Sequence, residues 1–579
     1  MKVTTFTKLA IGLGVVALSV VGLVVPANAD PSGPSSTALV GVGSDTTQDV
    51  MDEIAAAIGD GKLASYKSTI GEGQSEFLQP RPDRPVPTAA PTPYPTASPF
   101  ANPQNLLRAK GSGDGYKILA VAEGSVASLS NVSTFTGGSR TINKGNTVGQ
   151  IDYSRASSKQ GNANTNGEYV NVPFAIDSVG IAVNPGDAAA KIPLEGLGTT
   201  SDGPTKATVD SIFRCQAKFV FINNISVGVG TVAGSTFTKS AHGLAVGDRV
   251  KFTTTGALPN GLSADTNYYV KAAATANTFT VSATKTGDAV TTTSAGTGSM
   301  TIVKTMGAAN TFNSMGAAAG DAPANTTAYQ VTPLIPGYGS GTASYFIGKI
   351  GRTEGAGFPA AGDAGQNCIS RTFIDNTTPI QEHSGAAVAE RENSMIVYSI
   401  GQWTSQTNSD ITGATNRTSG TTLLTFLPVV ADTARVFDST NGFGPTRSLA
   451  FDTPSAHNLV VGDAVRFSRA SGALPTGIVE GQTYYVVEVP YSSGFNVSAT
   501  LGGAKIVLPD ASNGMSGLKI TRVIAPTTGS GATLAPNENW TSDLKRVVYN
   551  VMPYRKAADP NNPLNKMFVG TNSLVCQQT

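Results

Sequence analysis

The sequence predicts an α/β protein with a mainly parallel sheet, into which two small all-β modules are inserted. Short apolar runs alternate with helical patterns along much of the chain, and this alternation favours parallel strands covered by helices on both faces. A segment that occurs twice, at residues 241–284 and 456–500, shows instead the period-two pattern of short antiparallel strands. We therefore expect an α/β host that carries two β-modules.

Length and composition narrow the class of protein. The chain has 579 residues, a formal net charge of +1 and 14% charged residues, so it has room for about two to four domains. It contains no basic block that would indicate nucleic acid as a partner. Glycine is frequent, with 65 residues, which suits a β-rich extracellular protein better than a helical cytosolic enzyme.

The first residues are typical of a secretory signal peptide. Lys2 and Lys8 flank the start, a long apolar run follows, and small residues precede an expected cleavage after Ala29. An uncleaved membrane anchor is the alternative. No cysteine follows the apolar run, so we expect no lipid anchor. The sequence predicts a secreted, extracellular protein, free or associated with a cell wall, with no membrane span after cleavage.

The cysteines favour one disulfide and one remaining thiol. Cys215, Cys368 and Cys576 are the three in the chain, and an exported chain is expected to oxidise a pair. We favour Cys215–Cys368. The spacings are too wide for a zinc motif and histidine is scarce, so we expect neither a metal nor a cofactor.

The host elements follow in order along the chain. Residues 37–58 are expected to form a strand, a polar turn and a helix, and residues 329–351 repeat that plan. Residues 110–122 combine glycines with a helical start, and residues 172–184 form a β-rich crossing segment. A Pro-rich stretch at residues 79–103 is expected to be an extended loop.

The two repeats are expected to occupy host loops, because insertions at exposed loop tips cost little stability. His242 and His457 hold matched positions in the copies, where we expect a turn or strand-end role rather than a ligand site. The paired tyrosines of each copy are interpreted as sheet residues, with a sugar-stacking surface as the alternative. The expected division is a signal peptide at 1–29, host segments at 30–225, 306–433 and 524–579, and β-modules at 226–305 and 434–523.

Three Ser-bearing, Gly-rich turns indicate an anion site. They are GVGSDTT at 41–47, KGSGDGY at 110–116 and YGSGTAS at 338–344, and a further polar turn at 152–158 adds an arginine. Helix N-termini present free N–H groups and the positive end of the helix dipole. If these turns converge, their N–H and O–H groups would surround a tetrahedral oxyanion.

The order of these motifs resembles the phosphate-binding proteins of ABC transporters. GSDTT, GSGDG, IDYSRASS, VPFAIDSVGIAVN, GSGT and EHSGAAVAERENSMIVYSIGQWTSQ occur in that family's order, and the secreted actinobacterial branch is the most similar. The resemblance covers the host, but not the β-modules or the Pro-rich loop. It implies a type II periplasmic-binding-protein fold, in which two α/β lobes close on the ligand.

The resemblance also implies which residues bind the ligand, through hydroxyl groups and backbone N–H. The family's first turn corresponds to Ser44, Asp45 and Thr46. Its later turns correspond to Ser112 and to Ser340, Gly341 and Thr342.

Two departures from the family pattern concern charge. Pro336 stands where phosphate binders have an arginine, and Ser157 stands where they have an aspartate that accepts the proton of phosphate. We hypothesise that Arg155 replaces the cation, with an ion pair as the alternative. We hypothesise that Asp45 replaces the acceptor, with a helix N-cap as the alternative.

The leading functional expectation is a solute-binding protein, not an enzyme, that captures phosphate or a related oxyanion for an ABC permease. Its hinge would lie at residues 172–184 and 410–428. The alternative is a surface or matrix protein whose β-modules bind cell-wall glycan or another protein. A hydrolase is the third reading. His383 is then the one host histidine, but we expect it to be structural, with Glu382 beside it pointing elsewhere.

Overall fold

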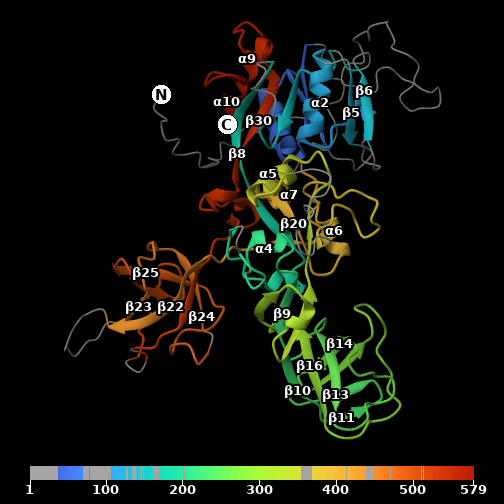
Figure 1. Cartoon of the computed structure of the whole chain (residues 1–579), viewed down its shortest axis with the longest axis vertical. Coiled ribbons are helices and arrows are strands. Elements are labelled where there is room, and N and C mark those ends of the chain that lie inside the picture. The colour runs from blue at the N-terminus through green and yellow to red at the C-terminus, as the bar shows by residue number, and fades with distance from the viewer. Residues whose placement is uncertain are drawn as a thin grey trace, which may run out of the picture.

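A computed structural model describes most of the chain (Figure 1). The described residues are 37–68, 77–78, 106–125, 128–133, 139–143, 147, 149–160, 168–199, 202–353, 368–411, 414–438, 449–469, 471–509, 512 and 514–578. The expected signal peptide and Pro-rich loop lie outside them. Among the described residues, no helix is long and apolar enough to cross a membrane.

The predicted fold class is wrong. Strands make up 34% of the described residues and helices 18%, with several antiparallel sheets and a closed six-stranded barrel. Three strand pairs are parallel, and every other named pair in the described part is antiparallel. The expected strand–turn–helix units do form, but apolar periodicity does not indicate strand direction. Most strand pairs of the described residues are antiparallel.

The largest sheet runs in the order β19-β20-β8-β30-β7-β1-β2, with β21 also paired to β8. Its strands are β1 (Leu39–Gly43), β2 (Leu63–Ser65), β7 (Tyr153–Ala156), β8 (Tyr169–Val183), β19 (Thr332–Leu334), β20 (Ser394–Ser399), β21 (Thr422–Leu423) and β30 (Lys545–Pro553). The parallel pairs are β1–β2, β1–β7 and β19–β20. Strand β8 pairs antiparallel with β30 along its first part and with β20 along its last part.

The described helices lie at both ends of this sheet, except one short helix at residues 319–321 that contacts β18 (Thr326–Gln330) of a smaller sheet. They are η1 (Asp45–Thr47), α1 (Gln48–Ile58), α2 (Ser112–Ala122), η3 (Ala188–Lys191), α4 (Val209–Phe213), η4 (Ala319–Asp321), α5 (Gly341–Lys349), α6 (Ala386–Glu390), α7 (Ile400–Thr407), η7 (Gly531–Thr533), η8 (Ser542–Leu544), α8 (Tyr554–Ala557), α9 (Pro563–Phe568) and α10 (Leu574–Gln578). One apolar core packs α2 against β1 and β7, and another packs α1 and α9 against the other face. Separate cores surround the β20 end of the sheet.

The two ends of the sheet meet at a narrow waist. Ile176, Asp177 and Ser178 of β8 pair there with β30 alone. Ile176 is 73% exposed and its cross-strand partner Val547 is 38% exposed. Figure 1 shows β8 and β30 running between the upper part of the molecule and the part that carries α5, α7 and β20. A two-stranded connection that is exposed on the face of Ile176 and Val547 is the thinnest link in this sheet.

Smaller sheets surround the large one. A three-stranded sheet joins β9 (Phe219–Asn223), β17 (Phe312–Gly316) and β18 (Thr326–Gln330), and three hairpin-sized pairs join β3 (Phe77–Leu78) with β4 (Leu106–Leu107), β5 (Ser128–Ser133) with β6 (Ser139–Asn143), and β28 (Thr527–Thr528) with β29 (Ala535–Pro536).

Each copy of the repeat lies in its own antiparallel unit. The first unit is a seven-stranded sheet of β10 (Ile225–Gly228), β11 (Thr231–Ala233), β12 (Thr236–Thr238), β13 (Arg249–Thr254), β14 (Tyr268–Thr275), β15 (Thr278–Ser282) and β16 (Met300–Met306). The second is the closed barrel of β22 (Val429–Asp438), β23 (Leu449–Asp452), β24 (Ala464–Arg469), β25 (Tyr484–Tyr491), β26 (Gly494–Ser498) and β27 (Leu518–Arg522). Strands at matched positions of the two copies have the same neighbours. The units differ at one edge. In the second unit β23 pairs with β22 and closes the barrel, whereas its counterpart β12 in the first unit pairs with β11.

The matched histidines organise turns in both units. Nδ1 of His242 accepts the backbone N–H of Leu244 at 3.0 Å, and Nδ1 of His457 accepts that of Leu459 at 2.9 Å. Each ring also packs edge-on against a core phenylalanine. These contacts describe a turn role, as expected from the sequence.

The expected disulfide between Cys215 and Cys368 is present. It links Cys215, two residues after the end of α4, to Cys368 in the segment before β20, across a separation of 153 residues. Cys576 is exposed and lies outside this disulfide.

Candidate functional site

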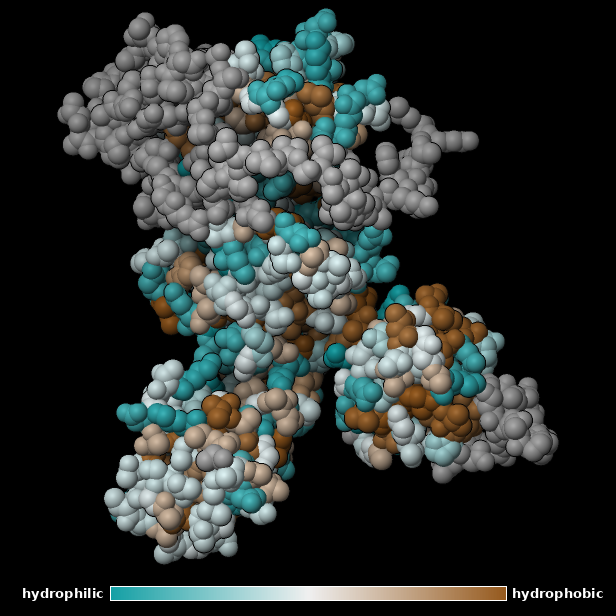
Figure 2. All heavy atoms as spheres, turned by 180° about the vertical axis from the view of Figure 1, so that it is seen from behind, coloured by the Kyte–Doolittle hydropathy of each residue, from teal (hydrophilic) through white to brown (hydrophobic). Residues whose placement is uncertain are grey.

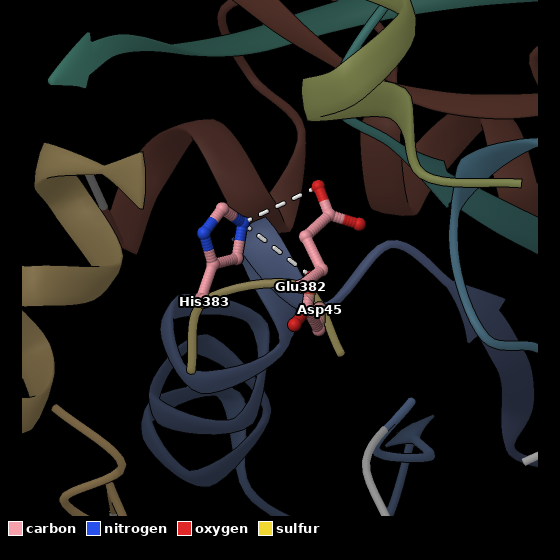
Figure 3. A group of neighbouring side chains, drawn as sticks. All are labelled: Asp45, Glu382 and His383. Atoms are coloured by element: carbon pink, nitrogen blue, oxygen red, sulfur yellow. Dashed lines mark ion pairs between the residues drawn. The ribbon is translucent and has the colours of Figure 1, made fainter. Parts of the chain in front are cut away.

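Buried polar side chains from distant parts of the chain meet beside the waist. We call them the junction cluster: Asp45, Thr46, Thr342, Glu382, His383 and Arg546, all buried. They come from η1, the first turn of α5, the loop before α6, and β30. Figure 3 shows three of them, with the His383 ring directed toward the carboxylates of Asp45 and Glu382. Burying so many polar groups costs free energy unless they satisfy one another.

Helix capping places two members of the cluster. The Ser44 side chain caps η1 by accepting the N–H of Thr46 at 3.2 Å. Ser340 caps α5 by accepting the N–H of Ala343 at 3.0 Å. Thr46 and Thr342 thereby face each other, with 3.2 Å between their hydroxyl oxygens although they are 296 residues apart.

Glu382 and His383 both reach the cluster because the backbone turns between them. His383 has φ +52°, a left-handed conformation that interrupts an extended strand. The expectation that Glu382 points elsewhere is therefore wrong. The buried ring of His383 contacts Thr46 Oγ1 at 2.9 Å through Nε2, and the same nitrogen lies 3.3 Å from Glu382 Oε1.

One carboxylate oxygen collects several donors. Glu382 Oε1 accepts the backbone N–H of Thr342 at 3.0 Å and the Thr46 hydroxyl at 3.4 Å, in addition to its contact with His383 Nε2. Burial alone would raise the pKa of Glu382, but the interactions with His383, Thr342 and Arg546 outweigh it and lower that pKa to about 2. Glu382 is therefore an anion at neutral pH, seated on the N-terminus of a helix.

Asp45 is the opposite case. Burial raises the pKa of Asp45 well above its usual range, and the adjacent negative charge of Glu382 raises it further. Within the described residues neither of its carboxylate oxygens has a conventional hydrogen-bond partner, and its ion-pair distance to Arg417 is 3.7 Å. Two adjacent buried carboxylates cannot both ionise easily. Of the two carboxyl groups, Asp45 is the one whose pKa is raised, so burial favours its protonated form.

Arg546 supplies the fixed cation of the cluster. It lies opposite Asp177 in the β8–β30 ladder, and its Nε and Nη2 donate to Asp177 Oδ2 at 3.0 and 2.7 Å. Nη2 also donates to Thr342 Oγ1 at 2.7 Å and to Thr46 Oγ1 at 3.2 Å. Nη1 is buried and has no hydrogen-bond partner in the described part of the chain.

The tautomer of His383 bears on whether the cluster could hold a metal. Asp45, Glu382 and His383 place possible ligand atoms within 4.8 Å of one another. However, Nδ1 of His383 accepts the backbone N–H of Ser399 at 3.1 Å, so the neutral ring carries its proton on Nε2. A metal would need the lone pair of that nitrogen. The arrangement suits an acceptor, such as an anion, better than a cation.

The remaining predicted binding residues pack beside the cluster. Ser112 Oγ and Ser157 Oγ are 3.0 Å apart, and Ser112 Oγ accepts the N–H of Ser157. A Cβ on Gly341 would lie 2.4 Å from Ser112 Oγ and 2.3 Å from Ser157 Oγ. The structure thus brings all three Gly-rich turns together.

Arg155 does not join the cluster. It is fully buried on β7 and donates to the carbonyls of Ser44 and Tyr66 and to the Ser65 hydroxyl. The hydrogen bonds of Arg155 therefore link β7 to the segment of β2, which lies on the far side of β1. Burial lowers the pKa of its guanidinium, opposed by neighbouring acidic side chains.

The sequence analysis did not identify Arg546, and its expectation for the direction of Glu382 was wrong. The segment around Arg546 reads as an ordinary strand, and its contact with Thr46 spans 500 residues. The pair Glu-His was visible, but only the positive φ at His383 turns both side chains toward Asp45.

Comparisons with known proteins add nothing to this geometry: no family model, no curated protein and no solved structure matches the chain.

Proposed function

We propose that this protein binds phosphate or a related oxyanion at the junction cluster and does no chemistry on it. The observation that carries the proposal is the convergence of donors on Glu382 Oε1: it accepts a helix N–H and a hydroxyl, and the imidazole Nε2 of His383 lies 3.3 Å away. Such donors would stabilise an oxygen of a bound oxyanion in the same way as they stabilise the carboxylate oxygen of Glu382. A capture protein of the solute-binding type, which passes its ligand to a permease, is the role that the motif order supports.

Both charged and neutral groups of the cluster fit an oxyanion. Arg546 offers a buried guanidinium, and Thr46 and Thr342 offer hydroxyls. Because the pKa of Asp45 is raised, its protonated carboxyl would donate a hydrogen bond. Asp45 would then not reject sulfate, which lacks a proton to give. We therefore expect the site to accept both sulfate and phosphate.

The ligand reaches this buried site when the sheet bends at the waist. The β8–β30 ladder carries a register shift between Val548 and Tyr549, where Pro173 lies opposite. Irregular ladders with exposed side chains bend more easily than covered ones. Bending at the waist separates η1 from α5 and exposes Thr46 and Thr342.

Isothermal titration calorimetry of the purified protein with phosphate, and separately with sulfate, tests the proposal after bound anions are removed by dialysis. Saturable binding of one anion per chain is expected. Thr342→Val removes one hydroxyl and should weaken binding about tenfold, equivalent to ~1.4 kcal/mol. Thr404→Val is the matched control, because the Thr404 hydroxyl donates to Ile400 O of its own helix and contacts no member of the junction cluster among the described residues. The proposal fails if neither anion produces heat or a thermal shift.

A second candidate function rests on the barrel. Five aliphatic side chains there are exposed between 59% and 81%: Val460, Val461, Val479, Leu501 and Val507. The matched residues of the first repeat are Ala245, Val246, Ser263, Lys285 and Thr291. Figure 2 shows brown, apolar surface on this unit. We propose that the barrel contacts a partner protein, since glycans are usually held on aromatic rings rather than aliphatic side chains.

Replacing three barrel residues with those of the first repeat tests this candidate. The variant Val479→Ser, Leu501→Lys, Val507→Thr should move from the cell-surface fraction of the producing cells into the medium, with its phosphate affinity unchanged. Equal retention of the variant and the unaltered protein on the cells would contradict it.

A further inference from the structure

The Glu382 carboxylate lies where the hydrogen-bond donors of the junction cluster meet. Its Oε1 occupies the point where donors from η1 and α5 converge, 3.3 Å from His383 Nε2. Its other oxygen, Oε2, is buried without a hydrogen-bond partner among the described residues. The carboxylate is thus held through one oxygen, in the position that an oxygen of a bound anion would take.

Glu382 is placed on a segment that can release it. It belongs to a loop between β19 and α6, outside the large sheet. Its carbonyl accepts Arg417 Nη1 at 3.4 Å, and that distance is long for a hydrogen bond to a guanidinium. Rotating the Glu382 side chain away leaves the donors of Thr46, Thr342 and His383 in place, because their positions come from helix caps and from Ser399.

A second observation points to a ligand richer in oxygen than a carboxylate. Arg546 uses Nε and Nη2 on Asp177, Thr46 and Thr342, while its buried Nη1 has no acceptor in the described part of the chain. An unpartnered buried guanidinium N–H is costly. A tetrahedral oxyanion has four oxygens, so it could satisfy both the donors now on Glu382 and this remaining N–H.

From these contacts we propose that Glu382 is a tethered competitor, which occupies the oxyanion position in the ligand-free protein and is displaced by the ligand. The proposal rests on the proposed function. Glu382 would then set the affinity for the solute. Without solute, its carboxylate accepts the hydrogen bonds of the cluster's donors. A binding oxyanion must compete with this carboxylate for the same donors. Such competition keeps affinity moderate, which allows the ligand to be released again.

Calorimetric titration of phosphate into the unaltered protein, Glu382→Ala and Glu382→Gln tests the proposal. Removing the competitor should strengthen phosphate binding at least about tenfold in Glu382→Ala, equivalent to ~1.4 kcal/mol. Glu382→Gln keeps an amide oxygen for the Thr342 N–H but loses the charge, so its affinity should lie between the two. The control is Glu480→Ala, whose side chain is exposed on the barrel and which should bind as the unaltered protein does.

A thermal readout separates competition from a merely structural role. Without phosphate, Glu382→Ala should melt below the unaltered protein, and phosphate should raise its melting temperature by more than it raises that of the unaltered protein. If the unaltered protein binds phosphate and both variants bind it equally or more weakly, Glu382 is not a competitor, although the site is real. If the unaltered protein and both variants all fail to bind, the proposed function itself is wrong.

Discussion

At the scale of single residues, charge placement decides what the junction cluster can hold. The pKa of Glu382 is lowered, the pKa of Asp45 is raised, and Arg546 is paired with Asp177. The cluster therefore combines one internal anion with a set of donors. A buried ion pair with unpartnered neighbours is weak support for stability, so we attribute the arrangement to binding.

Replacing Arg546 with lysine tests the guanidinium. Lysine keeps the charge but cannot contact Asp177, Thr46 and Thr342 with a planar fork. Arg546→Lys should weaken phosphate binding about tenfold or more, as measured by calorimetry. Arg435→Lys, which alters an exposed arginine paired with Asp452 on the barrel, should leave phosphate affinity unchanged. Equal phosphate affinities of the two variants would mean that Arg546 does not contact the ligand.

The raised pKa of Asp45 predicts a pH-dependent stability. The folded protein keeps a proton on Asp45 that the unfolded chain loses above about pH 4, so raising the pH destabilises the folded state as Asp45 is forced to ionise. Asp45→Asn cannot ionise. Its melting temperature relative to the unaltered protein should therefore rise between about pH 5 and pH 8.

The control for that experiment is Asp60→Asn. Asp60 is exposed and its pKa is lowered by Lys62, so it is ionised throughout that range and its variant should show no trend with pH. A fall in the relative melting temperature of Asp45→Asn toward alkaline pH would mean that Asp45 is ionised and needed by Arg417.

At the scale of elements, the first turn of α5 is the most constrained part of the site. Its N-cap Ser340, the N–H group of Thr342 and Gly341 all lie beside other turns or loops. Gly341 allows Ser112 and Ser157 to approach the helix, because any Cβ there would overlap their hydroxyl oxygens. Gly341 thus serves close packing rather than flexibility.

Two alanine substitutions in α5 test this packing. Gly341→Ala should cost about 1–3 kcal/mol of unfolding free energy, because the added methyl group forces the serines apart. Gly348→Ala, where a Cβ meets nothing within 4 Å, should gain up to about 1 kcal/mol from helix propensity. Chemical denaturation measures both. A neutral Gly341→Ala would show that the three turns are not tightly packed.

At the scale of the whole molecule, the host depends on contacts between distant segments, and the disulfide is one of them. Reducing Cys215–Cys368 should cost about 2–4 kcal/mol, because it frees a long loop in the unfolded chain. Both tryptophans, Trp403 and Trp540, lie in cores around the β20 end of the large sheet. Their fluorescence during denaturation, with and without reductant, reports on that part and not on the β-units. Denaturation curves that coincide with and without reductant would contradict the predicted loss of stability.

The sequence allowed the local features of the fold to be predicted, but not the way they join. The strand–turn–helix units, the disulfide and the residues of the three turns follow from patterns within short segments. Strand direction does not, since β8 and β30 show the same apolar periodicity whether their partners are parallel or antiparallel. Arg546 could not be found because nothing near it differs from an ordinary strand, and Glu382 was misjudged because one positive φ reorients it.

The most direct test of an oxyanion site with a displaced Glu382 is a crystal structure with tungstate, whose tungsten atom is located by anomalous scattering. We predict a tungsten peak between the N–H of Thr342 and Nη1 of Arg546, with the Glu382 carboxylate turned away from Thr342. A structure in which tungstate binds elsewhere, or in which Glu382 stays on the Thr342 N–H at saturating tungstate, would contradict this account.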